Sequence, residues 1–471
     1  MNQRKERVDS VFNPIIPGFS PDPSICRVVN DYYLCNSSFS YFPGLPIYHS
    51  TDLIHWEFLS FAINRSEQMD FSGGDTSRGL FAPTLRYHNG TFYIVCTNIS
   101  HGGNFLIYSS NLKEWSDPVW LEADGIDPSL YFEKDKVYYC GTHAPNGAEM
   151  DGLNNRIFLA ELDIKTGNLS NSTDIWQAVM RGAVWPEGPH IYRIKDYYYL
   201  LYAEGGTSTE HAVMVARSHE LFGPYENCPH NPILTHRHLG PHFPLRNVGH
   251  GDLVDDSTEN WWMVCLASRF RENADNMGRE TFLVKIEFIS GWPYACLGKG
   301  MLSEQTRGER IIVDFNKSSE LLQLKTTNQE WWSLKDDKWI LDGGTEVGSD
   351  GPHLLVIRQQ SFDFELEASV NVSSDAGLIL YQNEENYLTY TEREIEIVKA
   401  ARVEKILSSS RNPFLRINVK NQIATFNGEN PINISFLGST QAGGFVGTMI
   451  GIFNRGDARA IFCNIKAQFD I

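Results

Sequence analysis

Pro21-Asp22-Pro23-Ser24-Ile25 is the first copy of a short phrase that occurs five times along the 471-residue chain. The other copies are Ala82-Pro83-Thr84-Leu85, Ile126-Asp127-Pro128-Ser129-Leu130, Pro186-Glu187-Gly188-Pro189-His190-Ile191 and His250-Gly251-Asp252-Leu253-Val254. With the proline as the marker, and Gly251 in its place in the last copy, successive copies are 60, 45, 61 and 62 residues apart. The phrase therefore marks an internal repeat of five units, three of which carry an acid.

Two further apolar runs follow the phrase in every unit. The first run contains an aromatic pair: Tyr32-Tyr33, Phe92-Tyr93, Tyr138-Tyr139, Tyr197-Tyr198 and Trp261-Trp262. The second run is Ile47-Tyr48, Leu106-Ile107-Tyr108, Ile157-Phe158-Leu159, Val213-Met214-Val215 and Phe282-Leu283-Val284. Several short aromatic strands per unit at a regular period are typical of a β-propeller. The sequence therefore predicts an all-β protein that begins with a five-bladed β-propeller.

The repeat predicts that three acids far apart in the sequence share one site. The first strand of each propeller blade lines the central axis, so equivalent positions converge at one end of the channel. Asp22, Asp127 and Glu187 lie at or next to the same position of units one, three and four. Carboxylates gathered in this way push their pKa values apart, which leaves one acid protonated and another ionised. Two such groups on either side of a glycosidic bond can hydrolyse it.

Several phrases resemble glycoside hydrolase family 43, in particular its β-xylosidase branch. They are Gly18-Phe19-Ser20-Pro21-Asp22-Pro23-Ser24-Ile25, Phe42-Pro43-Gly44, Tyr48-His49-Ser50, Asp127-Pro128-Ser129-Leu130, Trp185-Pro186-Glu187-Gly188-Pro189 and Gly278-Arg279-Glu280-Thr281. The resemblance implies a five-bladed propeller followed by a C-terminal β-sandwich domain. Period-two alternation in residues 362–368 and 414–419 fits the sandwich. We predict a catalytic propeller domain over residues 10–300 and a sandwich domain over residues 314–471.

The same resemblance implies a role for each acid and for several neighbours. Asp22 is expected to be the general base, Glu187 the general acid, and Asp127 the residue that tunes and orients Glu187. The substrate-binding residues it implies are Phe39, Phe81, Arg279 and, from a loop of the sandwich, Phe445. Phe81 stands where the branch carries a tryptophan, and Ile126 where it often carries a phenylalanine. These two departures leave the preferred sugar open.

His250 occupies the fifth position of the ring. A single histidine is usually a structural residue, whereas the resemblance implies that this one faces the axial channel and helps to hold a calcium ion. Calcium prefers oxygen ligands, so carbonyl groups and water would have to complete its shell. We expect no organic cofactor.

Composition narrows the range of partners. The formal charge of −18 disfavours a nucleic-acid surface or an anionic substrate, whereas a neutral oligosaccharide is not repelled. The eight cysteines form no CxxC pair and are predicted to be buried free thiols. The polar N-terminal residues 1–7 are not followed by an apolar stretch, so we expect the sequence to contain neither a signal peptide nor a membrane span. We therefore expect a cytoplasmic protein, or a secreted one if a leader has been removed; relatives in the family imply a homo-oligomer.

The predicted activity is exo-acting, inverting release of terminal xylose from β-1,4-xylo-oligosaccharides. An α-L-arabinofuranosidase, or an enzyme with both activities, is the nearest alternative because the two pentoses present similar hydroxyl groups. Retaining fructan hydrolases fit less well, because they pair Arg-Asp-Pro with Glu-Cys where this chain has Ile126-Asp127-Pro128 and Glu187-Gly188. A sugar-binding propeller without catalytic activity is the alternative from another class, and the presence of all three acids disfavours it.

Overall fold

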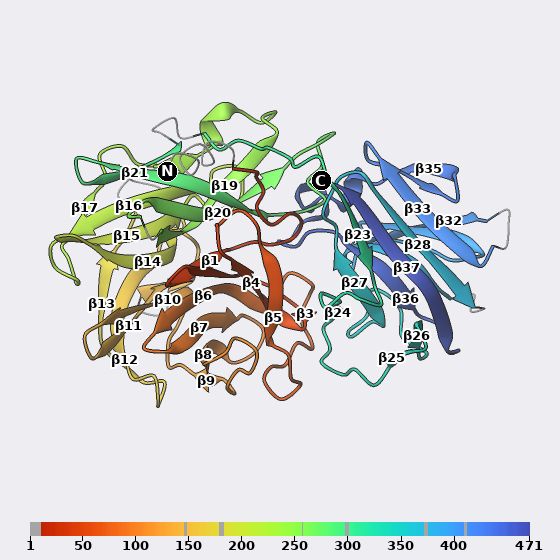
Figure 1. Ribbon diagram of the computed structural model, residues 1–471, viewed down its shortest axis with the longest axis horizontal. Coiled ribbons are helices and arrows are strands. Elements are labelled where there is room, and N and C mark those ends of the chain that lie inside the picture. The colour runs from red at the N-terminus through yellow and green to blue at the C-terminus, as the bar shows by residue number, and fades with distance from the viewer. Residues whose placement is uncertain are drawn as a thin grey trace, which may run out of the picture.

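The computed structural model describes residues 11–145, 148–178, 183–256, 258–296, 301–371, 375–408 and 412–471. The regular secondary structure of the described part is almost entirely β-strand (Figure 1). The helices within the described ranges are short: η2 (Arg237–Leu239), η4 (Ser435–Leu437) and α1 (Ser439–Ala442). No helix in these ranges has the length and apolar character needed to cross a membrane. The chain is an all-β protein, as predicted.

Five small antiparallel sheets follow one another along residues 24–295. The first has β1 (Ser24–Val28), β2 (Asp31–Cys35), β4 (Gly44–Ser50) and β5 (Glu57–Ile63); the second has β6 (Leu80–His88), β7 (Thr91–Asn98), β8 (Gly103–Ser109) and β9 (Val119–Trp120). The third has β10 (Ile126–Glu133), β11 (Lys136–His143), β12 (Arg156–Leu162) and β13 (Leu169–Trp176). The fourth has β14 (Glu187–Ile194), β15 (Tyr197–Glu204), β16 (Ala212–Ser218), β17 (Glu226–Asn227) and β18 (Leu234–Thr235). The fifth has β19 (Leu245–Asp255), β20 (Trp261–Arg269), β21 (Glu280–Ile289) and β22 (Trp292–Ala295).

The three sequence signals of each repeat fall on corresponding strands of these sheets. The aromatic pairs all lie in the second strand, and the following apolar runs all lie in the third. Tight turns join the first two strands of the first four sheets; Asn89 and Gly90, both with positive φ (49° and 84°), connect β6 to β7. The first strands contact one another in a closed cycle, β1 to β6, β10, β14, β19 and back to β1. Equivalent positions of the repeat are therefore brought together in space.

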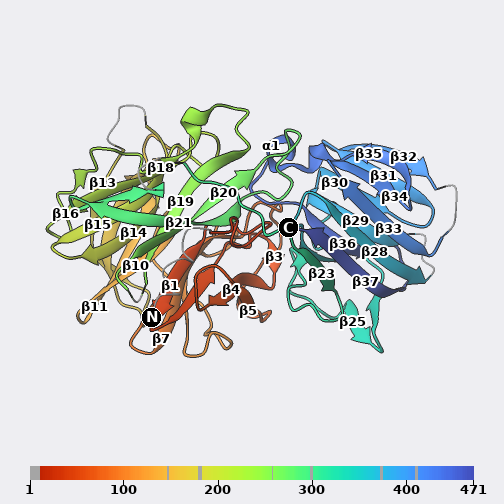
Figure 2. The same ribbon diagram turned by 45° about the horizontal axis from the view of Figure 1, so that its top comes forward.

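Two larger sheets form the C-terminal part and pack face to face as a β-sandwich (Figure 2). One contains β23 (Arg310–Asp314), β25 (Trp332–Lys335), β26 (Lys338–Leu341), β28 (Phe364–Asn371), β33 (Phe414–Lys420), β34 (Ile423–Phe426), β35 (Glu429–Asn433) and β37 (Ala460–Asp470). The other contains β27 (Leu354–Arg358), β29 (Ala376–Asn383), β30 (Asn386–Tyr390), β31 (Glu394–Lys399), β32 (Arg402–Leu407) and β36 (Met449–Asn454). Apolar residues of both sheets, such as Leu366 and Leu380, share one buried core. The alternation seen at residues 362–368 and 414–419 thus belongs to β28 and β33, whose inward side chains fill that core.

The two parts of the chain are joined by backbone pairing as well as by side chains. The two-residue strand β24 (Gln323–Leu324), which follows the sandwich strand β23 in the chain, pairs with β3 (Tyr41–Phe42) of the first repeat. Within the first part of the chain, the Ile15 N–H donates to the Thr281 carbonyl in β21, so the N-terminal segment lies beside the fifth sheet. Residue 10 and residues 297–300, at the limits of the predicted first domain, lie outside the described ranges.

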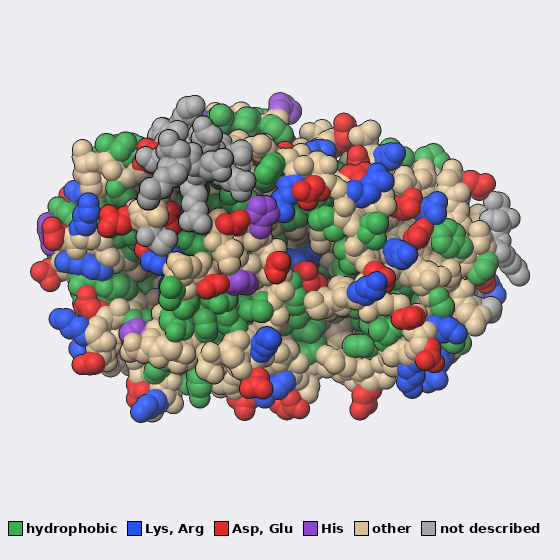
Figure 3. Space-filling view, in the orientation of Figure 1, with side chains coloured by type: hydrophobic (Ala, Val, Ile, Leu, Met, Phe, Trp, Pro, Cys, Tyr) green, Lys and Arg blue, Asp and Glu red, His purple; other side chains and the backbone are tan. Residues whose placement is uncertain are grey.

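The thiols agree with the sequence-based expectation. All eight cysteines are free, and six of them are buried. On the face shown in Figure 3, acidic and basic side chains are interspersed over both parts of the molecule, and no broad basic area is visible there.

Candidate active site

One cavity of about 750 Å³ is lined by all three acids predicted to act together, Asp22, Asp127 and Glu187. Asp22 precedes β1, Asp127 is the second residue of β10, and Glu187 is the first residue of β14. They come from three sheets and are separated by up to 165 residues in the sequence. The closed cycle of first strands therefore brings them to a single site, as the repeat predicted.

The backbone at these positions explains why the side chains point into the cavity. Asp22, Ala82, Asp127, Gly188 and His250, the residues directly before the marker of each repeat, all have positive φ, between 32° and 56°. Register shifts interrupt the ladders of β6, β10, β14 and β19 at the same place. A residue with positive φ inside a β-bulge turns its side chain out of the ladder. In the fourth repeat a glycine holds this conformation, so the acid, Glu187, is displaced by one residue.

Asp22 is held as a carboxylate by its neighbours. Arg279 Nη1 donates to Asp22 Oδ1 at 3.0 Å, and the Ser37 hydroxyl donates to Oδ2 at 2.7 Å. His250 Nδ1 lies 3.9 Å from Oδ1. Burial alone would raise the pKa of Asp22, but the Arg279 guanidinium, His250 and the Ser37 hydroxyl together lower it below its usual value. This group is therefore ionised at neutral pH.

Glu187 has the opposite environment. The Asn155 amide donates to its Oε1 at 3.4 Å, and none of its hydrogen-bond partners in the described ranges is a cation. Burial, together with the negative charges of Asp127 and Asp22, raises the pKa of Glu187 well above its usual value. Trp185, whose indole lines the same cavity, adds an apolar wall. This environment favours the protonated, uncharged form of Glu187, which is the form that can donate a proton.

The pKa of Asp127 is raised, whereas that of Asp22 is lowered and that of Glu187 is raised well above its usual value. The Gly188 backbone N–H donates to its Oδ2 at 3.1 Å, which ties Asp127 to the residue following Glu187. Burial raises the pKa of Asp127 to about 6, a shift that His250 opposes and the charge of Asp22 reinforces. The carboxyl group of Asp127 thus acts on Glu187 through its charge and through the local backbone.

The predicted binding residues form one wall of the cavity. Phe39 and Phe81 have ring centroids 4.9 Å apart, and the ring of Phe445 lies 6.3 Å from Phe39 and 6.2 Å from Phe81. Phe445 belongs to the C-terminal part and is fastened by its backbone: its N–H donates to Ser77 Oγ at 2.9 Å, and its carbonyl accepts from Arg279 Nη2 at 3.3 Å. The loop from the sandwich therefore reaches the cavity as predicted.

Other residues of the cavity were not recognised from the sequence. Thr207 Oγ1 accepts from Arg279 Nη1 at 3.0 Å, and His211 Nδ1 lies 3.0 Å from the Asn247 carbonyl. Burial lowers the pKa of His211 to about 3, so its imidazole is neutral. The run Gly205-Gly206-Thr207-Ser208-Thr209, directly after a second strand, was the only available signal. Its small polar residues are common in loops, which is why it was not singled out.

Side chains alone do not form a calcium site at His250 within the described ranges. Its imidazole lines the cavity, and Asp22 is the one described acid with which it makes an ion-pair contact; the oxygen atoms of Asp22 are engaged by Arg279 and Ser37. No cluster of three or more His, Cys, Asp or Glu side chains within the described ranges is arranged to hold a metal ion. Calcium requires about six to eight oxygen ligands. A calcium ion held through His250 would therefore need carbonyl groups and water for the rest of its shell, and it stays a prediction.

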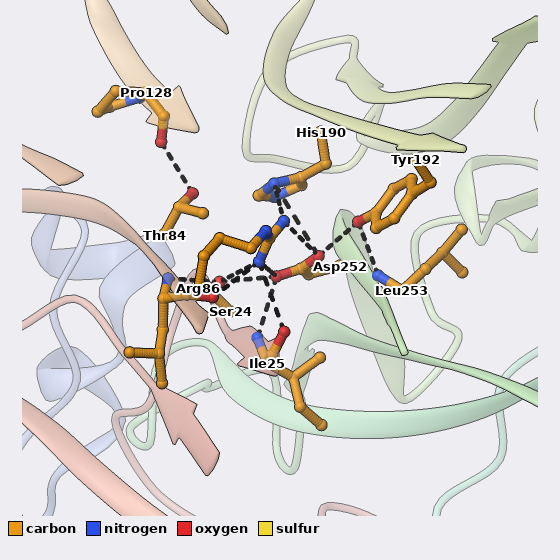
Figure 4. A network of polar contacts seen from close by, with 10 residues as sticks. Ser24, Ile25, Thr84, Arg86, Pro128, His190, Tyr192, Asp252 and Leu253 are labelled. Carbon is orange, nitrogen blue, oxygen red and sulfur yellow. Dashed lines mark hydrogen bonds and ion pairs between the residues drawn. The ribbon is translucent and has the colours of Figure 1, made fainter. Parts of the chain in front are cut away.

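A guanidinium group lies among the first strands instead (Figure 4). Arg86 of β6 makes a two-pronged ion pair with Asp252 of β19, at 2.8 and 3.0 Å, and its Nη2 also contacts His190 Nδ1 of β14 at 2.9 Å. Asp252 further accepts from the Ser24 hydroxyl, the Ile25 N–H and the Tyr192 hydroxyl. Burial lowers the pKa of His190 to about 3, so its neutral ring can accept from Arg86. The positive charge in this region is thus supplied by the protein.

Comparisons with known proteins identify the family of the chain. The family model "Glycosyl hydrolases family 43" matches residues 11–293, and "Beta xylosidase C-terminal Concanavalin A-like domain" matches residues 314–471. A xylosidase/arabinosidase of Butyrivibrio fibrisolvens is 38% identical over 94% of this chain and 95% of its own length. A non-reducing end alpha-L-arabinofuranosidase of Bacteroides ovatus is 33% identical over 95% of this chain and 92% of its own. The crystal structure of a xylan beta-1,4-xylosidase from Bacillus halodurans superposes with a TM-score of 0.86 at 29% identity, covering 98% of this chain and 100% of that one. The chain therefore belongs to glycosyl hydrolase family 43.

Proposed function

We propose that this glycosidase is an exo-acting, inverting β-xylosidase that releases terminal xylose from β-1,4-xylo-oligosaccharides. The observation that carries the proposal is the contrast between two carboxyl groups in one cavity: the pKa of Asp22 is lowered and that of Glu187 is raised. An ionised base and a protonated acid are the pair that single-step glycoside hydrolysis requires. The xylosidase relatives support xylose as the sugar.

In the proposed reaction, Glu187 donates its proton to the oxygen of the leaving sugar while that bond breaks. Asp22 accepts a proton from a water molecule, which attacks the anomeric carbon from the opposite face. An inverting arrangement needs the two carboxyl groups roughly 6.5–9.5 Å apart, so that the water fits between Asp22 and the sugar. Arg279 keeps Asp22 ionised and is placed to donate to sugar hydroxyl groups. Asp127 keeps Glu187 protonated through its charge and fixes its position through Gly188.

The enclosure of the cavity supports exo action. Phe39, Phe81 and Phe445 form an aromatic wall over one end, and Phe445 is supplied by a separate part of the chain. A cavity closed at that end accepts the terminus of a chain more readily than its interior. Apolar rings also stack well against the faces of a sugar.

Proton NMR of the first sugar formed tests the mechanism. We expect α-xylose to appear first from a β-linked substrate, followed by slow mutarotation; β-xylose as the first product would refute inversion. Glu187→Gln and Asp22→Asn should each lower kcat by roughly 100- to 10,000-fold, the usual contribution of general acid–base catalysis. Either variant with near-normal turnover and an unchanged melting temperature would refute its assigned role.

An α-L-arabinofuranosidase, or an enzyme with both activities, is the second candidate. Phe81, which replaces a tryptophan of the β-xylosidase branch, makes T-shaped contact with Phe445 in the wall that faces the sugar, and a relative that is 33% identical is an arabinofuranosidase. Parallel assays on 4-nitrophenyl β-D-xylopyranoside and 4-nitrophenyl α-L-arabinofuranoside separate the candidates by their kcat/KM. Calorimetric binding of xylose without turnover of either glycoside would instead favour a sugar-binding protein without catalytic activity.

The finer description of the architecture is also a proposal. We interpret the five small sheets as the blades of a five-bladed β-propeller, because their first strands contact one another in a closed cycle. We assign the catalytic domain to residues 10–300 and the sandwich domain to residues 314–471. A homo-oligomeric state and a cytoplasmic location stay predictions, which analytical ultracentrifugation and cell fractionation can check.

A further inference from the structure

Arg246 is a second guanidinium in the wall of the active-site cavity. It lies in β19, four residues before His250, and its side chain is half-buried. Its Nε donates to the Phe243 carbonyl at 2.8 Å, and its guanidinium carbon lies 3.9 Å from the ring centroid of Phe270. These two contacts hold the guanidinium plane against an aromatic face. Its orientation is therefore set before any ligand arrives.

The terminal nitrogen atoms of Arg246 are free to bind a ligand. Neither Nη1 nor Nη2 of Arg246 has a hydrogen-bond partner or a carboxylate partner within the described ranges. Asp275 is the acid whose charge acts on Arg246, but its carboxylate accepts hydrogen bonds from Ser439 and Thr440. Burial lowers the pKa of Arg246, as expected for a cation that has lost water without gaining a partner. A donor group that is oriented, partly desolvated and unpaired is suited to binding oxygen atoms of a ligand.

Arg279, the other guanidinium of the cavity, shows the contrast. It donates to Asp22, Thr207 and the Phe445 carbonyl and is enclosed by the aromatic wall, 5.6 Å from the ring of Phe39. The charge of Arg279 acts on Asp22, whereas Asp275 is the one carboxylate among the described residues whose charge acts on Arg246. Arg279 therefore belongs with the sugar that reacts, and Arg246 lies beyond it.

The cavity has room for more than this reacting sugar. Its volume of about 750 Å³ falls in the ~300–1,000 Å³ range that encloses ligands of drug size. A single pentose ring between the acids and the aromatic wall leaves part of this space unfilled. We propose that Arg246 binds the leaving-group sugar, the unit joined to the reacting sugar by the bond that breaks, by donating from Nη1 and Nη2 to its hydroxyl and ring oxygen atoms.

This assignment rests on the proposed hydrolase function and adds a determinant of substrate preference to it. Arg246 would favour true oligosaccharides over glycosides whose leaving group offers few oxygen acceptors. The variant Arg246→Met removes the donors while keeping an apolar stem against Phe270. Arg271→Met is the matched control, because Arg271 also lies over a phenylalanine, 5.1 Å from the ring of Phe362, but is exposed and outside the cavity.

The test compares kcat/KM for xylobiose and for 4-nitrophenyl β-D-xylopyranoside in wild type and both variants. We expect Arg246→Met to lose about 10-fold or more on xylobiose, since bonds from a charged donor are lost, and less than about 3-fold on the aryl glycoside. Most of the loss should be in KM, and Arg271→Met should match wild type on both. Equal losses on both substrates, or no loss on xylobiose, would overturn the assignment.

A binding measurement keeps the inference separate from the hydrolase proposal. If wild type hydrolyses neither substrate, the proposed function fails, but titration calorimetry with xylobiose and xylose still tests Arg246. The variant should bind xylobiose about 10-fold more weakly and xylose as wild type does; an unchanged affinity for xylobiose would overturn the inference. If Arg246→Met does not fold, Arg246→Lys replaces it, with a smaller loss expected because the ammonium cannot present two parallel donors.

Discussion

Removing Arg279 should move the acid limb of the pH–activity profile. Its guanidinium is 3.0 Å from Asp22 Oδ1, both side chains are buried, and its charge is the largest influence that opposes the effect of burial on Asp22. An opposite charge within about 4–6 Å lowers a carboxylate pKa by roughly 1–3 units. In Arg279→Met the pKa of Asp22 should therefore rise by about that amount. This is equivalent to roughly 1.4–4 kcal/mol of lost stabilisation of the carboxylate.

The sign of the shift follows from the role of Asp22 as a base. The base must be ionised, so activity is lost as pH falls through its pKa, and a raised pKa moves that loss to higher pH. The acid limb of kcat/KM for 4-nitrophenyl β-D-xylopyranoside should thus move up by about 1–3 units in Arg279→Met. The basic limb, which reports Glu187, should move much less, because Arg279 is not among the groups that shift it.

Arg279→Lys is the matched control, because it keeps the charge and loses the fork of donors. Its acid limb should stay close to that of wild type while KM rises, since a lysine carries all its donors on one nitrogen and cannot reproduce the planar fork that reaches Asp22, Thr207 and the sugar. An unchanged acid limb in Arg279→Met, with the variant folded, would refute the role of Asp22 as the base or that of Arg279 in keeping it ionised.

Three further predictions follow from the same contacts. Activity should fall as pH rises through the raised pKa of Glu187, because the acid loses its proton. Glu187→Gln should lose far more activity on xylobiose than on 2,4-dinitrophenyl β-D-xyloside, whose leaving group needs no protonation. Equal losses on the two substrates would contradict the role of Glu187 as the acid. Phe445→Ala should lower kcat/KM by roughly 5- to 30-fold, mainly by raising KM. This corresponds to about 1–2 kcal/mol of binding free energy from the exposed ring surface that a sugar would cover. An unchanged KM would show that the ring does not contact the substrate. EDTA dialysis should leave the activity and melting temperature of wild type unchanged. Arg86→Met should lower the free energy of unfolding, measured by urea titration, by about 3–5 kcal/mol, because it leaves Asp252 buried without its cation. Low-millimolar guanidinium, or the double substitution Arg86→Met/Asp252→Leu, should restore part of that free energy. Loss of wild-type activity in EDTA would contradict the interpretation that the Arg86 guanidinium supplies the positive charge among the first strands.

Much of the fold was readable from the sequence because local patterns report local structure. The recurring phrase, the aromatic pair and the apolar run fell on the first, second and third strands of each small sheet. Period-two alternation likewise located β28 and β33 of the sandwich. Strand pairing between neighbours in the chain depends on turns such as Asn89-Gly90, so it leaves a signal in contiguous residues.

The candidate site could be predicted in part for a related reason. Equivalent positions of a closed repeat must converge, so Asp22, Asp127 and Glu187 could be grouped before any contact was known. Their differing environments could not be deduced in this way. The pKa of Asp22 depends on Arg279, 257 residues away, and on Ser37, which no motif marked.

The amino-acid sequence by itself determined the strands, their order and the residue types delivered to the site, because these depend on periodicity and on neighbours along the chain. The tertiary structure alone decided which charges meet. It gave Asp22, Asp127 and His250 the positive φ that turns their side chains out of the strands, whereas Gly188 holds that conformation in the fourth repeat and Glu187 precedes it by one residue. It also put Arg86 among the first strands, paired with Asp252, and left the terminal nitrogen atoms of Arg246 without a partner among the described residues of the cavity wall. Electrostatic and hydrogen-bond energies depend on distance in space and on burial, and neither quantity is written in the order of residues along the chain.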